Sequence, residues 1–487
     1  MEAPSALSKQ IVRGSLWAFA IRITGRLLGF IRTIVLARLL VPEDFGLLGI
    51  AILAVNVLET FSYTGFQSAL IQKRDNIETY FDTAWTVSAS RGLFLFLILL
   101  VSAPALASFF NSPNAVLIIQ IVATASLITG LRNVGIISFQ KNLEFHKQFK
   151  FELPPNLVDL IVSVSLAFIL RDVWALVWGG MAGNLSRLFL SYYLHPYRPR
   201  LKFDKSQFKE LFGFGKWVLG SSILIFLITQ GDNVFVGKML GVALLGLYQM
   251  AFLLAYLPSS EISYVISQVI FPAYSRLQDD MPALREGYLR VLQITLFLSA
   301  IISALIFALA PDFTAIFLGE KWMPMVPAMQ ILVLAAFLTS ITETSALVFI
   351  AVGKPKIETI FQVTRFVVLA IFIYPLSLQW GIAGTSAAVL LSIAVSCIGL
   401  TFMTIRITDT GITRFVRRSA IPAINGLAAA SAIFLLKVYL EPGILSFLVT
   451  GSAGVVTYLL LTLLADRIFD YKMWPIAQET LGSIRGS

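Results

Sequence analysis

The feature that most constrains this chain is the recurrence of apolar stretches of spanning length from one end to the other. About 20 apolar residues suffice to cross a bilayer as a helix. The chain is 57% hydrophobic and only 13% charged, with a mean hydropathy of +0.83, which lies far outside the range of soluble proteins. No stretch has the composition of a separate soluble domain. The sequence therefore predicts an all-α, polytopic membrane protein.

Proline, glycine and charge clusters divide the 487 residues into about fourteen predicted transmembrane helices. Their limits are 14–40, 45–68, 84–108, 115–138, 153–170, 173–194, 214–239, 244–270, 289–310, 325–350, 357–378, 382–404, 418–437 and 444–465. The first span follows Lys9 and Arg13 without a small-residue cleavage site, so we expect it to be retained and not removed as a signal peptide.

The distribution of basic residues predicts the orientation in the membrane. With the N-terminus in the cytoplasm, 25 of the 37 Lys and Arg fall in cytoplasmic segments, five in outer segments and seven within spans. Positive charge is enriched in cytoplasmic loops of membrane proteins. We therefore expect both termini to be cytoplasmic.

The two halves of the chain resemble each other weakly but in order. At an offset of 200 residues, Leu40 matches Leu240 and Gly46-Leu47 matches Gly246-Leu247. Six spans per half preserve orientation, which predicts parallel repeats with a transport site between two lobes. The predicted parts are two pseudo-symmetric six-helix lobes at 1–197 and 214–405, a cytoplasmic amphipathic linker at 198–213 that lies on the membrane, and two additional C-terminal helices with a cytoplasmic tail at 406–487.

The first span carries Arg22, Arg26, Arg32 and Arg38, although each such charge costs a few kcal/mol or more near the bilayer centre. On a helical wheel, Arg22, Arg26 and Arg32 fall with Gly25 and Gly29 in one sector roughly 120° wide. This face should contact protein or water. Arg38 lies near the outer end, where it can reach the membrane interface.

Two interpretations of this cationic face remain open. Each arginine can pair with a carboxylate on another span, or Arg22 and Arg26 can form an anion site, because a guanidinium offers forked donors that match phosphate. The acidic candidates for pairing, gating or ion coupling are Glu59, Asp159, Asp232, Glu261 and Glu343.

Two pairs of opposite charge occupy equivalent positions of the repeat. Arg32 corresponds to Asp232, and Asp159 corresponds to Arg365. If both lobes point these positions at a central cleft, the pairs can close alternate ends of the pathway. The alternative is that each charge pairs within its own lobe.

Several classes of site have no support in the sequence. There is no GxxxxGK[ST] motif, so transport would use an ion gradient, the membrane potential or the substrate gradient. A buried carboxylate can carry a proton, and Asp232 and Glu343 are candidates for coupling to H+ or Na+. The single Cys397 and two histidines indicate neither a disulfide within the chain nor a metal cluster. We expect no cofactor, no enzymatic activity and no nucleic-acid partner.

Four segments together resemble a known family. They are SLWAF…RLLVPEDFGLLGIA near the N-terminus, VWALVWGGMAGNLSR (173–187), GDNVFVGKMLGVALLGLYQMA (231–251) and LGEKWMPMVPAMQILVLAAF (318–337). In order and spacing they are similar to the polysaccharide transporter (Wzx-type flippase) family, within the multidrug/oligosaccharidyl-lipid/polysaccharide exporters. The resemblance spans essentially the whole chain.

The resemblance implies a two-lobed bundle with a cationic cavity. It also implies transfer of polyprenyl-diphosphate-linked oligosaccharides to the outer leaflet of the bacterial inner membrane, for O-antigen, exopolysaccharide or capsule synthesis. In related flippases the last two helices form a groove for the lipid tail, and a polymerase or chain-length machinery is a possible partner. The candidate sugar-binding residues are Gln230, Asn233, Tyr248, Tyr256 and Tyr264.

Three other functions stay open at this point. A multidrug exporter has the same plan but favours cationic substrates, which the arginine face disfavours and the acidic residues keep possible. A lipid II flippase is also expected to have a cationic cavity. A membrane scaffold for a glycan synthesis complex would not need charges inside both lobes.

Overall fold

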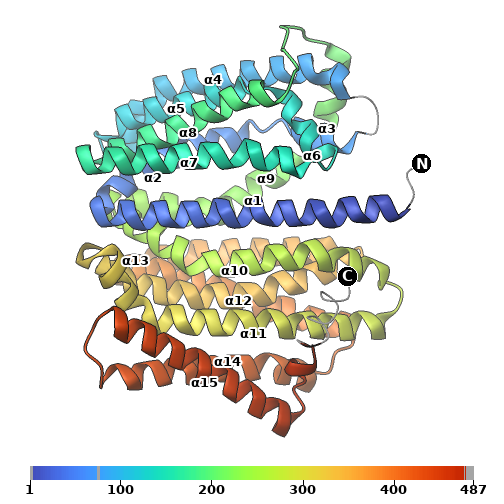
Figure 1. The fold of residues 1–487 in the computed structure, drawn as a ribbon, viewed down its shortest axis with the longest axis vertical. Coiled ribbons are helices and arrows are strands. Elements are labelled where there is room, and N and C mark those ends of the chain that lie inside the picture. Colours follow the sequence, from blue (N-terminus) through green and yellow to red (C-terminus); the bar gives the residue numbers. More distant parts are fainter. Residues whose placement is uncertain (1–3, 74–76, 477, 479–487) are drawn as a thin grey trace. The chain divides into compact units, whose positions relative to one another are not determined.

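The computed structural model describes residues 4–73, 77–476 and 478, and in these residues every regular element is helical (Figure 1). The all-α prediction is therefore confirmed. By contacts between Cα atoms, the chain forms two compact units, Met1–Gly246 and Leu247–Ser487. We call these the first and second units and describe each by itself.

The first unit contains the helices up to α9. They are α1 (Pro4–Leu39), α2 (Pro42–Phe61), α3 (Phe66–Gln72), η1 (Ile77–Tyr80), α4 (Phe81–Phe109), α5 (Ala115–Gly130), η2 (Val134–Ile136), α6 (Ile137–Lys141), α7 (Phe145–Leu170), α8 (Val173–Leu194) and α9 (Lys205–Met239). The start of α10 (Val242–Arg276) also belongs to it.

The second unit holds the rest of α10 and the helices that follow. They are α11 (Met281–Phe313), η3 (Thr314–Leu318), η4 (Glu320–Met325), α12 (Val326–Ala351), α13 (Pro355–Thr408), α14 (Ile412–Lys437) and α15 (Ile444–Phe469). The chain leaves helical geometry inside α13 at Trp380 and Gly381, where Gly381 has φ of +55°. The predicted spans 357–378 and 382–404 are the two arms on either side of this break.

In the described residues, nine helices are long and apolar enough to cross a membrane, or ten if the bent pair Ala115–Gly130 and Val134–Lys141 is one span. The protein is thus a multi-pass membrane protein. The number fourteen remains a prediction, because helices such as α1 carry more charge than a simple apolar span.

Acidic residues cap several helices of the first unit. Asp44 of α2 accepts a hydrogen bond from the Val41 N–H at 3.0 Å, and Asp172 accepts one from the Trp174 N–H at the start of α8, also at 3.0 Å. Asp204 accepts from the N–H groups of Ser206 and Gln207 at the start of α9. Such caps satisfy N–H groups that have no partner within the helix.

Glycines allow α7 and α8 to pack closely in the first unit. A Cβ atom added at Gly179 of α8 would overlap the hydroxyl of Ser163 on α7, and at Gly183 it would lie 3.2 Å from the Pro155 carbonyl oxygen. This small-xxx-small spacing brings two membrane helices together in the absence of a hydrophobic driving force. The VWGGMAG segment therefore has a direct packing role.

The helical part of the linker packs on the first unit. It forms the first turns of α9, where Phe208 and Leu211 contact a cluster that includes Phe66, Leu70 and Phe81. Lys73 forms an ion pair with Glu210, and Tyr80 donates a hydrogen bond to Glu210 at 2.9 Å. These contacts place α9 with the first unit, whereas the repeat assigned it to the second lobe; the repeat-based division stays a prediction.

In the second unit, α11 contacts α12, α14 and α15. Tyr458 of α15 is fully buried and donates a hydrogen bond to the Phe297 carbonyl oxygen of α11 at 2.8 Å. Asn425 of α14 bonds Thr462 of α15 at 3.2 Å, and Lys437 of α14 pairs with Asp312 of α11. The last two helices are therefore packed on α11 and joined to it by polar contacts.

Candidate functional site in the first unit

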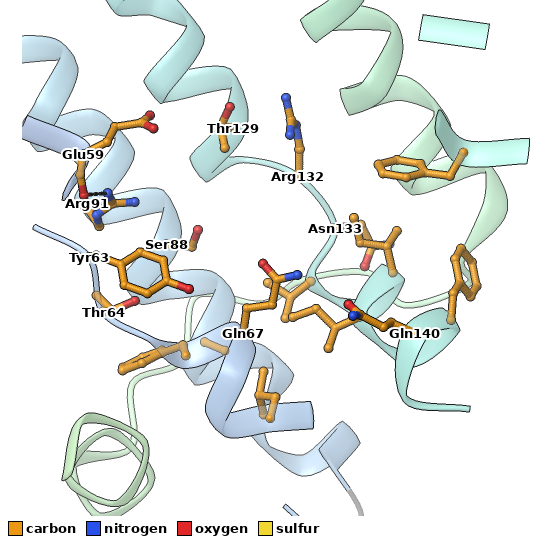
Figure 2. A pocket seen from close by; sticks show the side chains of 18 of the residues that line it. Glu59, Tyr63, Thr64, Gln67, Ser88, Arg91, Thr129, Arg132, Asn133 and Gln140 are labelled. Carbon is orange, nitrogen blue, oxygen red and sulfur yellow. Dashed lines mark hydrogen bonds between the residues drawn. The ribbon is translucent and has the colours of Figure 1, made fainter. Parts of the chain in front are cut away.

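A cavity of about 500 Å³ lies within the first unit (Figure 2). Its walls come from α2, α3, α4, α5, α6 and α7 and from the short connections between them. The volume falls within the usual range for small-ligand sites, about 300–1,000 Å³. Many of its lining side chains are polar: Asn56, Glu59, Thr60, Tyr63, Thr64, Gln67, Ser88, Arg91, Thr129, Arg132, Asn133, Gln140, Gln148 and Glu152.

In the view of Figure 2, Glu59 and Arg91 lie on one side of this cavity and Asn133 lies on the other. Gln67 lies between the two sides. The Arg91 guanidinium donates to the Glu59 carbonyl oxygen at 2.7 Å and to the Ser62 carbonyl oxygen and hydroxyl at 2.9 and 3.0 Å. The Glu59 carboxylate accepts a hydrogen bond from Ser126 at 3.0 Å. The Arg91 guanidinium therefore has three acceptors, and the Glu59 carboxylate has a donor in Ser126.

Arg132 and Gln148 also line the cavity, and each has a buried polar atom without a partner. Arg132 Nη2 donates to the Asn184 side chain at 2.8 Å, but Arg132 Nε and Gln148 Oε1 make no hydrogen bond among the described residues. A buried polar group left unsatisfied costs roughly 1–3 kcal/mol. One donor and one acceptor on side chains of lining residues are therefore left for a ligand or for water.

Polar residues continue along α7 behind the cavity. Glu152, which lines the cavity, pairs with Arg187 of α8 at 3.4 Å, and Arg187 also donates to Asn156 at 2.7 Å. One helical turn further, Asp159 pairs with Arg32 of α1 at 3.0 Å. The first unit thus holds a row of linked charges inside its helical bundle.

The structure places Arg32 and Asp159 together within one unit. The sequence assigned these residues to two different gates, with Asp232 and Arg365 as their partners, and left pairing within a lobe as the alternative. In the structure, Arg32 and Asp159 pair with each other within the first unit, as the alternative predicted. The Ser163 hydroxyl also accepts from Arg32 at 3.1 Å and donates to Asp159 at 2.8 Å, which strengthens the pair.

Arg22 and Arg26 lie on the same helix, α1. Arg22 is half-buried and Arg26 is exposed. Among the described residues that line the cavity, none belongs to α1. Gly25 between them lies near Asn156, with 3.6 Å from an added Cβ to its Nδ2 atom. Part of the small and cationic face therefore contacts α7, and the role of Arg22 and Arg26 stays a prediction.

The remaining predicted residues fall in both units. Gln230, Asp232 and Asn233 lie on α9 in the first unit, where Asp232 and Asn233 are buried and Asn233 donates to Gln230 at 3.2 Å. The others lie in the second unit: Tyr248, Tyr256 and Glu261 on α10, Glu343 on α12 and Arg365 on α13. The side chain of Tyr264 is outside the described residues. A shared site between these groups remains a prediction.

Sequence reasoning missed Arg91, Arg132 and Arg187, which all lie in or beside predicted spans. The signal was available, because the argument that a charge inside a membrane helix marks a site applies to them as it does to α1. Their partners, such as Asn184 and the Ser62 carbonyl oxygen, could not be named without the fold. Of the residues predicted in this part of the chain, Glu59 lines the cavity.

The fold and the charged interior define a polytopic membrane protein with polar sites between its helices. The model of the family described as "Polysaccharide biosynthesis protein" matches residues 35–327. Since this is more than half of the chain, the protein belongs to that family, and the resemblance noted in the sequence is confirmed.

Curated relatives agree with this assignment, and a solved structure has a similar fold. The chain is 24% identical to the succinoglycan biosynthesis transport protein ExoT of Rhizobium meliloti, over 95% of each chain. It is 23% identical to the lipopolysaccharide biosynthesis protein WzxC of Escherichia coli, over 74% of each. A structure of the lipid II flippase MurJ in an inward closed conformation matches 94% of this chain and 99% of its own with a TM-score of 0.73 and 16% identity, which shows a shared fold.

Proposed function

We propose that this protein is a flippase for polyprenyl-diphosphate-linked oligosaccharides in the bacterial inner membrane. It moves the lipid-linked sugar from the cytoplasmic to the outer leaflet for the synthesis of an exported polysaccharide. The observation that carries the proposal is membership of the polysaccharide biosynthesis family by a membrane protein with a polar cavity among its helices.

The physical problem that such a protein solves is desolvation of the headgroup. A hydroxyl moved from water into an apolar environment without a hydrogen bond costs roughly 2–7 kcal/mol, and an oligosaccharide carries many hydroxyls. Side chains such as Asn56, Gln67 and Gln140 provide replacement donors and acceptors inside the bundle. The lipid tail can remain in the bilayer while the headgroup crosses.

The proposed mechanism is alternating access by two lobes, with Arg22 and Arg26 as the diphosphate-binding residues. Energy would come from an H+ or Na+ gradient, the membrane potential or the substrate gradient, and Asp232 and Glu343 are the proposed proton carriers. The proposal puts both termini in the cytoplasm, and the excess of basic residues in the segments predicted to be cytoplasmic supports this orientation.

The test is transport in proteoliposomes. The purified protein is reconstituted with a fluorescent polyprenyl-diphosphate oligosaccharide, and the fraction accessible to an impermeant quencher is followed with time. We expect faster movement than in protein-free vesicles and loss of that acceleration in Arg22→Ala and Arg26→Ala. Arg38→Ala, near the other end of the same helix, is the control and should transport normally.

Two results would contradict the proposal. No acceleration by the correctly folded wild-type protein would exclude flippase activity on this substrate. Acceleration of lipid II alone, or of a cationic dye alone, would favour the lipid II flippase or the multidrug exporter. Normal transport by the Arg22 and Arg26 variants would remove these two residues from the mechanism without excluding the activity.

A further inference from the structure

We infer that the cavity of the first unit is a subsite for uncharged sugar and that the diphosphate binds elsewhere. The inference rests on the proposed function, because it names the part of that substrate which this cavity takes. Three observations carry it: the balance of charge in the lining, the partners that the charged groups already have, and the chemistry of the atoms left without partners.

The charged residues of the lining balance one another. Two are acidic, Glu59 and Glu152, and two are basic, Arg91 and Arg132. A diphosphate placed here would gain two cations but would also lie near two carboxylates. In a low-dielectric interior such like-charge contacts are strongly unfavourable. A neutral ligand meets no net charge.

All four charged groups are also engaged by the protein: Arg132 donates to the Asn184 side chain at 2.8 Å, and the other three have the following partners. Arg91 donates to two carbonyl oxygens and a hydroxyl, Glu59 accepts from Ser126, and Glu152 pairs with Arg187. An anion that recruited Arg91 would have to displace contacts at 2.7 to 3.0 Å. Arg91 thus serves to shape the wall of the cavity.

The two atoms without partners are one donor and one acceptor. Arg132 Nε–H can only donate, and Gln148 Oε1 can only accept. A sugar hydroxyl has a proton to donate and lone pairs to accept, so sugar hydroxyls can satisfy an atom of either kind. A diphosphate oxygen can satisfy Arg132 but would face Gln148 Oε1 as a second acceptor. The pair therefore fits a polyol better than it fits an anion.

The rest of the lining agrees with a sugar ligand. Carboxamides of Asn56, Gln67 and Gln140 supply both donors and acceptors, and the rings of Tyr63 and Phe151 supply apolar surface. Binding sites for small molecules combine such apolar surface with a few placed polar groups.

The test measures binding of the two halves of the substrate separately. The probes are the oligosaccharide released by mild acid from the source cell's own lipid-linked intermediate, and bare undecaprenyl diphosphate. Each is titrated into the full-length protein in nanodiscs. The variants are Gln148→Leu, which removes the acceptor, Gln148→Glu, which keeps it and adds a negative charge, and Arg132→Gln.

We expect Gln148→Leu to weaken oligosaccharide binding about fivefold, the loss of roughly one neutral hydrogen bond. Arg132→Gln should weaken it by about the same factor or more, and Gln148→Glu by less than about threefold. The affinity for undecaprenyl diphosphate should change less than about twofold in all three. Gln120→Leu is the matched control, because Gln120 of α5 bonds the Leu100 carbonyl oxygen and is not among the lining residues.

The opposite pattern would overturn the inference. If Gln148→Glu weakens diphosphate binding tenfold or more and leaves oligosaccharide binding unchanged, the cavity holds the diphosphate. If the released oligosaccharide does not bind the wild-type protein, or if the variants bind it like wild type, the sugar subsite is absent. Transport in proteoliposomes is read independently, so the flippase proposal can stand when the subsite fails. Thermal unfolding of each variant separates loss of binding from loss of fold.

Discussion

The ion pair between Arg32 of α1 and Asp159 of α7 offers the sharpest test of the first unit. Arg32 Nε lies 3.0 Å from Asp159 Oδ1, and the side chains are 20% and 28% exposed. Ser163 bridges them, with its hydroxyl 3.1 Å from Arg32 Nε and 2.8 Å from Asp159 Oδ1. The perturbation is a double-mutant cycle of Arg32→Ala, Asp159→Ala and the double variant.

The expected magnitude lies between two limits. Removing one partner of a fully buried pair costs about 3–5 kcal/mol, because the other charge is left uncompensated. Exposed pairs have coupling energies of only about 0.2–1 kcal/mol. With roughly a quarter of each side chain exposed, we expect each single variant to lose about 2 kcal/mol of unfolding free energy and the coupling energy to be about 1–2 kcal/mol.

The assay is equilibrium unfolding in mixed detergent micelles, followed by a probe on the first unit. Asp159→Asn is the matched variant, because it retains an oxygen that accepts hydrogen bonds and should lose less than Asp159→Ala. The exchange Arg32→Asp with Asp159→Arg should recover part of the stability. A coupling energy below about 0.5 kcal/mol, with both single variants folded, would refute the claim that this pair stabilises the contact between α1 and α7.

Three further predictions concern packing, backbone geometry and pH. Gly179→Ala should lower the free energy of unfolding by about 1–3 kcal/mol, because its Cβ would overlap Ser163. Gly180→Ala is the control and should be neutral or slightly stabilising, because no atom lies within 4 Å of the new Cβ. Equal Tm values for the two variants would contradict the packing role of Gly179. Gly381→Ala should lower the free energy of unfolding by about 1 kcal/mol, because φ of +55° is unfavourable for a residue with a Cβ even though no atom lies within 4 Å of it. An unchanged Tm would show that the backbone at the break in α13 adapts to the new side chain. Partial burial lowers the pKa of His195, so its contribution to stability is complete above about pH 6.5 and is lost as the pH falls below that value toward the lower pKa of the folded state. Between pH 7.5 and 5.5, His195→Gln should show a smaller decrease in Tm than wild type, and an equal decrease would exclude this histidine as the source.

Much of the helical architecture could be predicted from the sequence. The apolar stretches predicted where long helices lie, and the interruption between 378 and 382 coincides with the break at Trp380 and Gly381. The motifs that resemble the polysaccharide transporters predicted the family to which the chain belongs. These features are local: hydropathy, glycine, proline and capping acids act over a few residues and need no knowledge of the neighbouring helix.

The partners of the charges were decided only by the tertiary structure. A helical wheel placed Arg32 on a face that avoids lipid, but it could not say that α7 packs on that face and brings Asp159 within 3.0 Å. The cavity likewise requires six helices and their connections to bring Glu59, Arg132 and Gln148 around one space. The periodicity of a helix determines which side chains share a face, whereas the helix that covers the face depends on side-chain shape, such as the missing Cβ of Gly179. The sequence alone determined that this chain had to bury charges in a membrane, and the packing of the helices determined where those charges meet.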